Sequence, residues 1–243
     1  MSICKNLSVV TAVCAIFTAA SALAGDLSNF NEAIEKVAAH NRVATNYLRT
    51  GNADLAAIEL DDMRGAWSKL TKRFEGKTPD AFADNALYSD LLQNTAGKID
   101  KTLGLIDSGD LPGAAKETID FREKLSAMRR ASGLYLLADC VLDANKAMDD
   151  FFVYKTNLPQ WGDKGVKADV QSKAAIYGYL LHRCDAMATP AVKADPEFRR
   201  LVDGAHNGLS FVPQAVSNED SGQLFRVLIE LRSFDNLLFF RFG

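Results

Sequence analysis

The chain has 243 residues, with 28 lysines and arginines against 31 aspartates and glutamates, so its formal net charge is −3 at pH 7. This acidic balance argues against nucleic-acid binding, because contact with a phosphate backbone needs basic patches that displace counterions. Hydrophobic residues make up 48% of the chain. That content is enough for the core of one large domain or two small ones without a scaffold of disulfides.

The first 24 residues have the three parts of a secretory signal peptide. Lys5 makes the start basic, an apolar run extends from Leu7 to Ala20, and Ala22-Leu23-Ala24 has the A-x-A pattern of a cleavage site. The run is too short to span a bilayer comfortably, and no later segment has the roughly 18 apolar residues that a membrane helix needs. We therefore expect cleavage near Ala24, export to the periplasm or the medium, and a mature protein that does not span a membrane.

After residue 24, apolar residues recur at intervals of three and four, which predicts an all-α protein. The first helix is expected at about residues 27–49, with Asn41 as the polar interruption of its apolar stripe. Gly133 is a weak boundary, because one glycine costs a helix only about 1 kcal/mol, so residues 112–156 could form one helix instead of two. The other helices are placed near residues 53–73, 84–107, 112–131, 133–156, 165–188, 196–214 and 220–241.

Turn signals divide these eight helices into four antiparallel hairpins. Three of the turns are followed 13 residues later by an arginine, which indicates a duplicated hairpin with a period of roughly 55 residues. Four hairpins make either two four-helix bundles or one extended stack. We expect halves at residues 25–131 and 132–243, whether separate or packed as one domain. The matched pairs are Gly51 with Arg64, Gly109 with Arg122, and Glu219 with Arg232.

Cys140 and Cys184 are the two cysteines that follow the signal peptide. In an oxidising compartment two cysteines are more often bonded than free, so we predict a disulfide between them. Two buried thiols or a metal site are the alternatives. A zinc site is disfavoured, because the sulfurs are far apart in sequence and no C-x-x-C motif or histidine pair accompanies them.

The three histidines, His40, His182 and His206, lie on different predicted helices, and no two have the spacing of a zinc motif. His182 stands out because its surroundings, residues 177–184, are apolar and aromatic, but packing or surface exposure is preferred to ligation. The predicted architecture resembles the haem-holding bundles of cytochrome c′ and cytochrome b562. Covalent haem is excluded because the chain has no C-x-x-C-H motif. A non-covalent haem between His182 and a methionine remains the alternative to a protein without a cofactor.

Two groups of acidic residues, Glu59-Asp61-Asp62 and Asp149-Asp150, are candidate metal ligands. Adjacent residues on a helix diverge by about 100°, so we predict that these carboxylates form solvated faces rather than metal sites. No catalytic set of residues is recognisable.

The last predicted helix, residues 220–241, is the most apolar segment after the signal peptide. Its apolar residues cover most of its circumference, so we expect it at the centre of the core or against a partner. Asp235 falls on its apolar stripe and needs a mate if it is buried and ionised. Arg232 and Arg241 are the local candidates. A structural ion pair is the simpler interpretation, and a ligand-facing pocket is the alternative.

Three segments are similar to an uncharacterised group of exported, all-helical bacterial proteins, and the similarity extends over the chain after residue 24. The resemblance implies a helical fold and export but no activity. We predict a non-catalytic binding or interaction module that engages a protein partner or a small ligand in grooves between its hairpins. A haem- or metal-binding bundle is the alternative. The three segments are Ala138-Asp139-Cys140, His182-Arg183-Cys184-Asp185 and residues 231–243.

Overall fold

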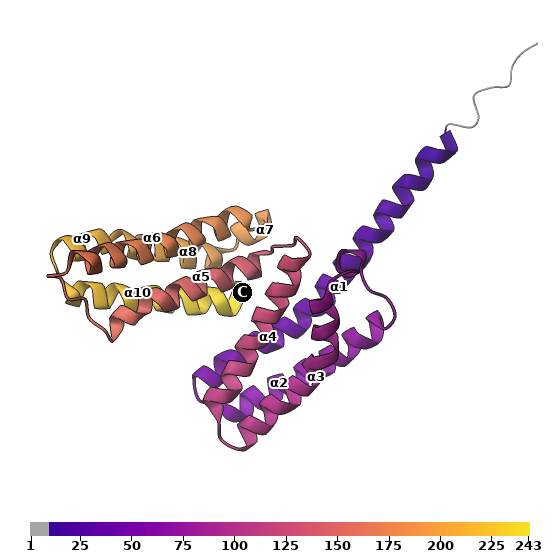
Figure 1. Ribbon diagram of the computed structural model, residues 1–243, viewed down its shortest axis with the longest axis horizontal. Helices are drawn as coiled ribbons and strands as arrows, with labels where there is room; N and C mark the ends of the chain where they lie inside the picture. The colour runs from indigo at the N-terminus through magenta and orange to yellow at the C-terminus, as the bar shows by residue number, and fades with distance from the viewer. Residues whose placement is uncertain (1–9) are drawn as a thin grey trace, which may run out of the picture. The chain divides into compact units, whose positions relative to one another are not determined.

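The computed structural model describes the backbone of residues 10–243 and the side chains of residues 25–243 apart from Lys164. The regular structure of this part is helical throughout, as the sequence predicts (Figure 1). None of its helices combines the length and the apolar character that crossing a membrane requires. The predicted signal peptide, residues 1–24, lies outside the residues whose side chains the structure describes. Cleavage near Ala24 therefore stays a prediction.

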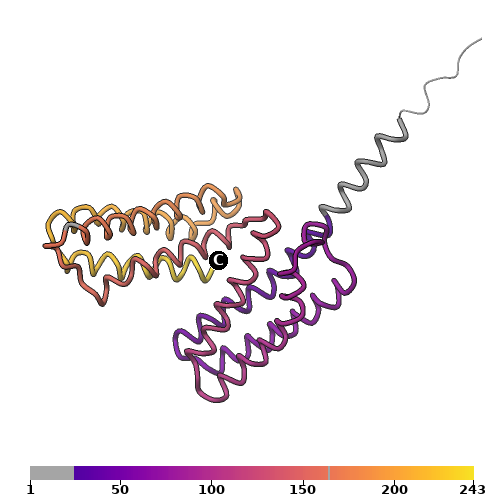
Figure 2. Tube along the Cα trace, viewed as in Figure 1, coloured from indigo at the N-terminus to yellow at the C-terminus, as the bar shows by residue number. Residues whose placement is uncertain are grey.

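The chain divides into two compact units, Met1–Leu134 and Tyr135–Gly243. The first is a bundle of four helices, in which each helix packs against the next and the fourth packs against the first. Figure 2 follows this up-and-down course of the backbone. The helices are α1 (Val10–Arg49), α2 (Ala53–Phe74), α3 (Ala86–Asp107) and α4 (Leu111–Ala131), with a short 3-10 helix, η1 (Asp80–Phe82), between α2 and α3.

The core of the first unit contains the apolar stripe that the sequence predicts for its first helix. Phe30 is fully buried at the centre of an aromatic group, and its ring lies 5.3–5.4 Å from the rings of Phe74, Phe82 and Tyr88. Asn41, the polar member of the stripe, is also buried, and its Nδ2 donates a hydrogen bond of 2.9 Å to the backbone oxygen of Thr118. The polar residue that interrupts the apolar stripe therefore links α1 to α4 through a hydrogen bond.

The second unit is also built around four long helical segments. α6 packs against α5, α8 and α9, and α10 packs against α5 and α8. The predicted helix at 196–214 is divided in two at Phe211, because Pro213 has no backbone N–H to continue the helix and its ring clashes with the preceding turn. The elements are α5 (Leu137–Phe152), η2 (Val153–Lys155), α6 (Lys164–Met187), α7 (Pro190–Lys193), α8 (Pro196–Ser210), α9 (Val212–Ser217) and α10 (Ser221–Phe242).

The weak boundary at Gly133 is a true break, so residues 112–156 form two helices. Gly133 has φ +72°, a left-handed conformation that glycine adopts without steric cost. Its N–H bonds to the carbonyl oxygen of Arg130 at 3.0 Å, and the N–H of Leu134 bonds to that of Arg129 at 2.9 Å. These two bonds satisfy the last carbonyls of α4 and end the helix.

The three turns used to predict a duplication share this left-handed helix end. Gly51 has φ +76° and Gly109 has φ +80°, while Glu219 takes the same position with φ +56°. The arginines that follow them have different surroundings. Arg64 is half exposed and Arg122 is buried. The common turn follows from a general way of ending helices, so the duplication stays a prediction.

Candidate functional site

A surface groove in the first unit lies between α1 and α2, with a cavity volume of about 480 Å³. Small side chains create it, since Ala33 on α1 faces Gly65 and Ala66 on α2. Cationic and acidic side chains line its rim. The full lining is Ala33, Lys36, His40, Asp62, Gly65, Ala66, Lys69, Leu70 and Arg73.

Three cations line the groove against one carboxylate, Asp62. Lys36 also pairs with Glu32 at 3.0 Å, and both side chains are well exposed. The hydrogen bond and the charge of Lys36 hold the pKa of Glu32 below its ordinary value, and the charge of Arg73 acts in the same direction. The rim formed by Lys36, Lys69 and Arg73 therefore presents net positive charge to a molecule in the groove.

One end of the groove carries a group of three side chains that could bind a metal ion. Nδ1 of His40 on α1 lies 2.8 Å from Oε2 of Glu59 on α2, and the two side chains are 34% and 24% exposed. Asp62 is the third member, and the candidate ligand atoms of all three lie within 4.8 Å of one another. Asp61 instead pairs with Arg64 at 3.2 Å. Glu59 and Asp62 share a helix face because they are three residues apart.

This group was not predicted from the sequence, because Glu59, Asp61 and Asp62 were interpreted as diverging carboxylates of a solvated face. The spacing between Glu59 and Asp62 was a usable signal, since residues three apart on a helix are neighbours. The approach of His40 had no local signal. It depends on the register between α1 and α2, which tertiary packing sets.

In the second unit, Asp235 is buried and accepts two hydrogen bonds on Oδ2. Asn145 Nδ2 donates one at 2.6 Å, and Arg232 Nη1 donates the other at 3.2 Å. Arg232 also pairs with Asp149 at 2.6 Å, and its guanidinium lies 4.7 Å from the centre of the Phe152 ring. Of the two arginines considered for Asp235, the structure therefore places Arg232 beside it. The contacts join α5 to α10 inside the bundle.

Tyr177 on α6 is fully buried near this ion pair. Burial holds the pKa of its hydroxyl well above the ordinary value of 10, and the negative charge of Asp235 adds to the increase while Arg232 opposes it. A hydrogen-bond interaction with the Asp235 carboxylate also raises the pKa, although the hydroxyl lies outside regular hydrogen-bond geometry. Tyr177 therefore remains a neutral phenol inside the bundle at all ordinary pH values.

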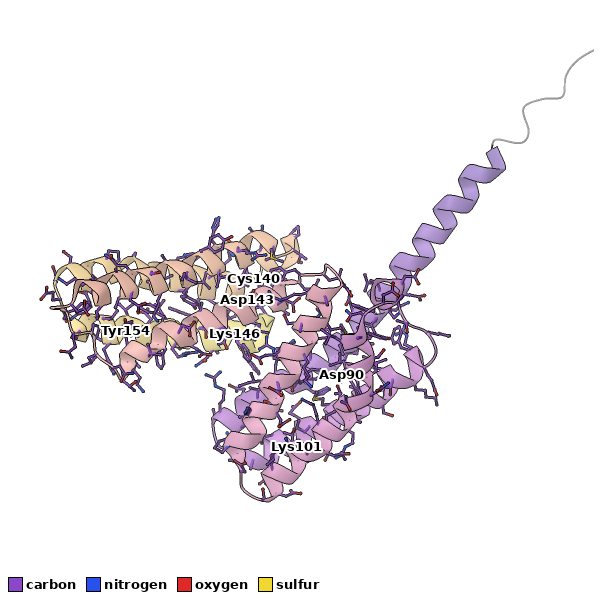
Figure 3. All side chains as sticks on the ribbon, in the orientation of Figure 1. Asp90, Lys101, Cys140, Asp143, Lys146 and Tyr154 are labelled. Carbon is purple, nitrogen blue, oxygen red and sulfur yellow. A yellow bond between two sulfur atoms is a disulfide. The ribbon has the colours of Figure 1, made fainter. Side chains whose placement is uncertain are left out.

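The predicted disulfide is present as a bonded pair that joins α5 to α6. The sulfur atoms of Cys140 and Cys184 are 2.15 Å apart, and their Cα atoms are separated by 5.5 Å. This Cα separation is usual for disulfides. Cys140 is labelled within the second unit in Figure 3.

The structure does not bring His182 together with Asp235 and Arg232. His182 is exposed on α6, His206 is partly exposed on α8, and none of the three histidines is buried. Three methionines, Met63, Met128 and Met148, lie in the bundle cores and are fully or almost fully buried. No observation favours a haem between His182 and a methionine.

The last helix does not lie at the centre of its core, although its apolar circumference led us to expect it either there or against a partner. One face of α10 carries the buried residues Leu224, Leu228 and Leu231. Phe225 and Ile229 lie on another face and are 40% and 43% exposed. The helix is one of the four walls of its bundle.

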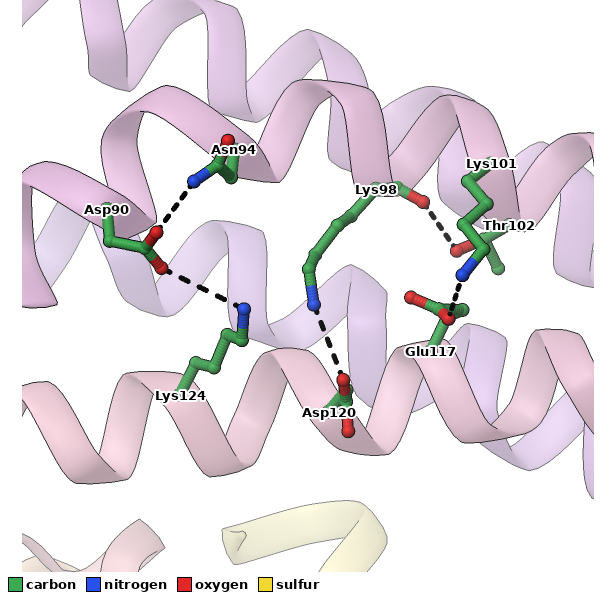
Figure 4. A network of polar contacts seen from close by, with 8 residues as sticks. All are labelled: Asp90, Asn94, Lys98, Lys101, Thr102, Glu117, Asp120 and Lys124. Carbon is green, nitrogen blue, oxygen red and sulfur yellow. Dashed lines mark hydrogen bonds and ion pairs between the residues drawn. The ribbon is translucent and has the colours of Figure 1, made fainter.

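The facing surfaces of α3 and α4 carry charge pairs, shown in Figure 4. Lys101 pairs with Glu117 at 2.7 Å, Lys98 with Asp120 at 3.4 Å, and Lys124 with Asp90 at 3.8 Å. Each lysine pairs with a carboxylate on the facing helix, so the network does not bring several metal-binding side chains to one point. Exposed pairs of this kind contribute roughly 0–1 kcal/mol each. We interpret the network as a solvated helix contact.

No known family model matches the chain, and no curated protein or solved structure is significantly similar to it.

Proposed function

We propose that the chain is an exported, non-catalytic binding module and that the groove between α1 and α2 is its working surface. The observation that carries this proposal is a cavity of about 480 Å³ within one compact unit, with small side chains between its walls and a cationic rim. Ligand sites of small molecules commonly have volumes of about 300–1,000 Å³. Export is supported by the Cys140–Cys184 disulfide, because disulfides persist mainly in oxidising compartments.

The chemistry of the lining favours a small organic anion as the ligand. Ala33, Ala66 and Leu70 offer an apolar surface, and Lys36, Lys69 and Arg73 offer charged donors to carboxylate or phosphate oxygens. Arginine binds such groups through two parallel hydrogen bonds, and lysine binds them as a point charge. A short dicarboxylate fits both the volume and the charge.

Binding is preferred to catalysis because the groove has a base but no hydroxyl or thiol nucleophile. His40, held by Glu59, resembles the base and orienting residue of a catalytic set. The lining contains no serine, threonine, tyrosine or cysteine that could accept activation by His40. The groove therefore supports recognition of a ligand more directly than a covalent mechanism.

The proposal is tested by titrating the full chain with succinate and, separately, with inorganic phosphate, while two-dimensional NMR follows the amides of Gly65 and Ala66. We expect saturable shifts with succinate. The variants Lys69→Gln and Arg73→Gln should weaken binding at least about tenfold each, because a charged hydrogen bond contributes about 1.5 kcal/mol or more. Lys72→Gln is the matched control, since Lys72 lines a different surface between α2 and α3.

Two results would contradict the proposed ligand site. One is the absence of saturable shifts at millimolar concentrations of either anion. The other is an equal loss of affinity in Lys72→Gln, which would indicate general charge attraction. Export is tested separately, by fractionation of cells that produce the full chain. Recovery of the uncleaved chain in the cytoplasm would contradict it.

A further inference from the structure

The group His40, Glu59 and Asp62 combines one imidazole and two carboxylates on two helices of the same bundle. It is the one set of three or more histidine, cysteine or acidic side chains with converging ligand atoms among those the structure describes. We propose that it binds a divalent transition-metal ion, with Zn²⁺ as the ion that suits it best. This inference does not depend on the anion proposed for the groove.

The backbone positions of the site are set by packing rather than by loops. α1 and α2 form the most extensive helix contact in the first unit, and they carry His40 and Glu59 opposite each other. Each of these two side chains is more than half shielded from solvent. Ligands held on rigid helices lose little conformational entropy when a metal binds. Asp62 is exposed, so its carboxylate can rotate toward the other two.

The distances suit a small ion after a modest movement of one side chain. Zinc binds imidazole nitrogen and carboxylate oxygen at about 2.0–2.2 Å, so ligand atoms around a tetrahedral ion are separated by about 3.3 Å. His40 and Glu59 are already 2.8 Å apart, and all pairs lie within 4.8 Å. A metal ion would replace the proton that His40 and Glu59 share in their hydrogen bond.

The ligand types favour a transition metal over the common hard cations. Calcium and magnesium prefer sites made of oxygen atoms, whereas an imidazole nitrogen suits zinc, copper and nickel. Three protein ligands leave a fourth position open, as in catalytic zinc sites, where water or a substrate occupies it. His40 and Asp62 also line the groove, so the open position faces the groove.

The positive charge of the groove rim opposes cation binding, but it does not outweigh the negative charge of the proposed ligands. Lys36 is held by Glu32 at 3.0 Å, which partly offsets its charge. Glu59 and Asp62 together supply two negative charges at ligand distance. Without a metal, the same geometry is an ordinary hydrogen bond between two helices. A measurement of metal binding therefore distinguishes a metal site from a structural hydrogen bond.

The test is calorimetric titration of the full chain, without a histidine tag, with Zn²⁺ and then with Mg²⁺. We expect one Zn²⁺ per chain and no comparable binding of Mg²⁺. His40→Ala and Glu59→Gln should each reduce zinc affinity at least about tenfold, since loss of an outer-shell partner alone costs 10–100-fold. His206→Ala and Asp61→Asn are matched controls that should leave the affinity unchanged. Thermal unfolding of each variant without metal checks that the bundle is intact.

Co²⁺ gives a second readout through its visible absorption, which is intense when nitrogen and oxygen ligands surround it in a four-coordinate site. The proposal is overturned if zinc does not bind with a definite stoichiometry. It is also overturned if His40→Ala, still folded, keeps the full affinity, or if Asp61→Asn loses as much as Glu59→Gln. Zinc binding with no effect of succinate on it would support the metal site while leaving the anion site without support.

Discussion

The first unit satisfies its buried threonine hydroxyls within single helices, whereas the second unit satisfies the buried carboxylate of Asp235 partly from another helix. In the first unit, the buried hydroxyls of Thr45, Thr95 and Thr102 each donate to a carbonyl oxygen four residues earlier in their own helix, at 2.7 Å. In the second unit, Asp235 is 1% exposed and depends on Arg232, three residues earlier on α10, and on Asn145, which reaches it from α5. The threonine bonds form wherever the helix forms, whereas the hydrogen bond from Asn145 to Asp235 needs correct tertiary packing.

The difference also separates residues that are accessible to ligands from residues that stabilise the fold. The partly exposed group of His40 and Glu59 in the first unit is accessible to ligands. The Asn145–Asp235 hydrogen bond and the disulfide of the second unit join helices inside it. Substitutions in the first unit should therefore alter recognition, and substitutions at these positions of the second should alter its free energy of unfolding.

The largest effect is expected from removal of the disulfide in Cys140→Ala/Cys184→Ala. The bond closes a loop with a sequence separation of 44. Chain-entropy arguments for a loop of that length give a loss of about 4 kcal/mol in the free energy of unfolding. Hydrogen exchange followed by mass spectrometry should show faster exchange in α5 and α6 while α1–α4 keep their protection. An equal loss of protection in both units would contradict the comparison.

A somewhat smaller effect is expected from Arg232→Met, which removes the cation beside Asp235. Loss of one partner from a buried ion pair typically costs about 3–5 kcal/mol, and we expect about 3 because Arg232 is partly exposed. Arg64→Met is the control from the first unit, since Arg64 also follows its turn by 13 residues and pairs with Asp61 and Asp100. Urea unfolding should give less than about 1 kcal/mol for it.

A double variant separates the cost of an isolated charge from the value of the pair. Arg232→Met/Asp235→Leu removes both charges, so it should recover part of the stability that Arg232→Met loses. A double variant less stable than Arg232→Met would instead show that the carboxylate stabilises the bundle through Asn145. Equal losses in Arg232→Met and Arg64→Met would remove the distinction between the two units.

Local patterns were sufficient to predict the helices. The three-and-four spacing from Phe30 to Leu48 is a property of a single helix, and the buried face of α1 follows it. Left-handed glycines mark helix ends, and Gly133 does so. The division at Phe211 was missed because Pro213 near the end of a predicted helix was given too little weight.

Contacts between helices were predictable only where chemistry narrowed the partners. Cys140 had one possible partner in Cys184, so the contact between α5 and α6 could be anticipated, whereas the arginine anticipated for Asp235 lies on the same helix. His40 and Glu59 lie on separate helices, and their approach depends on the relative rotation and register of those helices. Amphipathic patterns fix which face is buried but set register only loosely. The candidate metal site therefore emerged only from the structure.

The smallest effect at neutral pH, and the most specific one, is expected from Tyr177→Phe. The hydroxyl lies outside regular hydrogen-bond geometry with Asp235, so its removal should change the stability at pH 7 by less than about 1 kcal/mol.

At high pH the tyrosine should become important. Burial, followed by the charge of Asp235, raises the pKa of Tyr177 well above its ordinary value of 10. The folded chain therefore keeps a proton that the unfolded chain releases. Its contribution to stability is fully present below pH 10 and falls by about 1.4 kcal/mol per pH unit above it.

Tyr88 provides the comparison in the first unit, because burial alone raises the pKa of its hydroxyl. Tyr177→Phe should flatten the loss of stability above pH 10 in the second unit, and Tyr88→Phe should do so in the first. Urea unfolding between pH 9 and pH 11, followed by circular dichroism and by exchange in each unit, measures both. The effect of Tyr177 should be the larger, because a nearby carboxylate opposes its ionisation as well as burial. The prediction is contradicted if the free energy of unfolding falls equally steeply with pH in the wild-type chain and in Tyr177→Phe. That result would show that the phenol is exposed to water while the second unit is still folded.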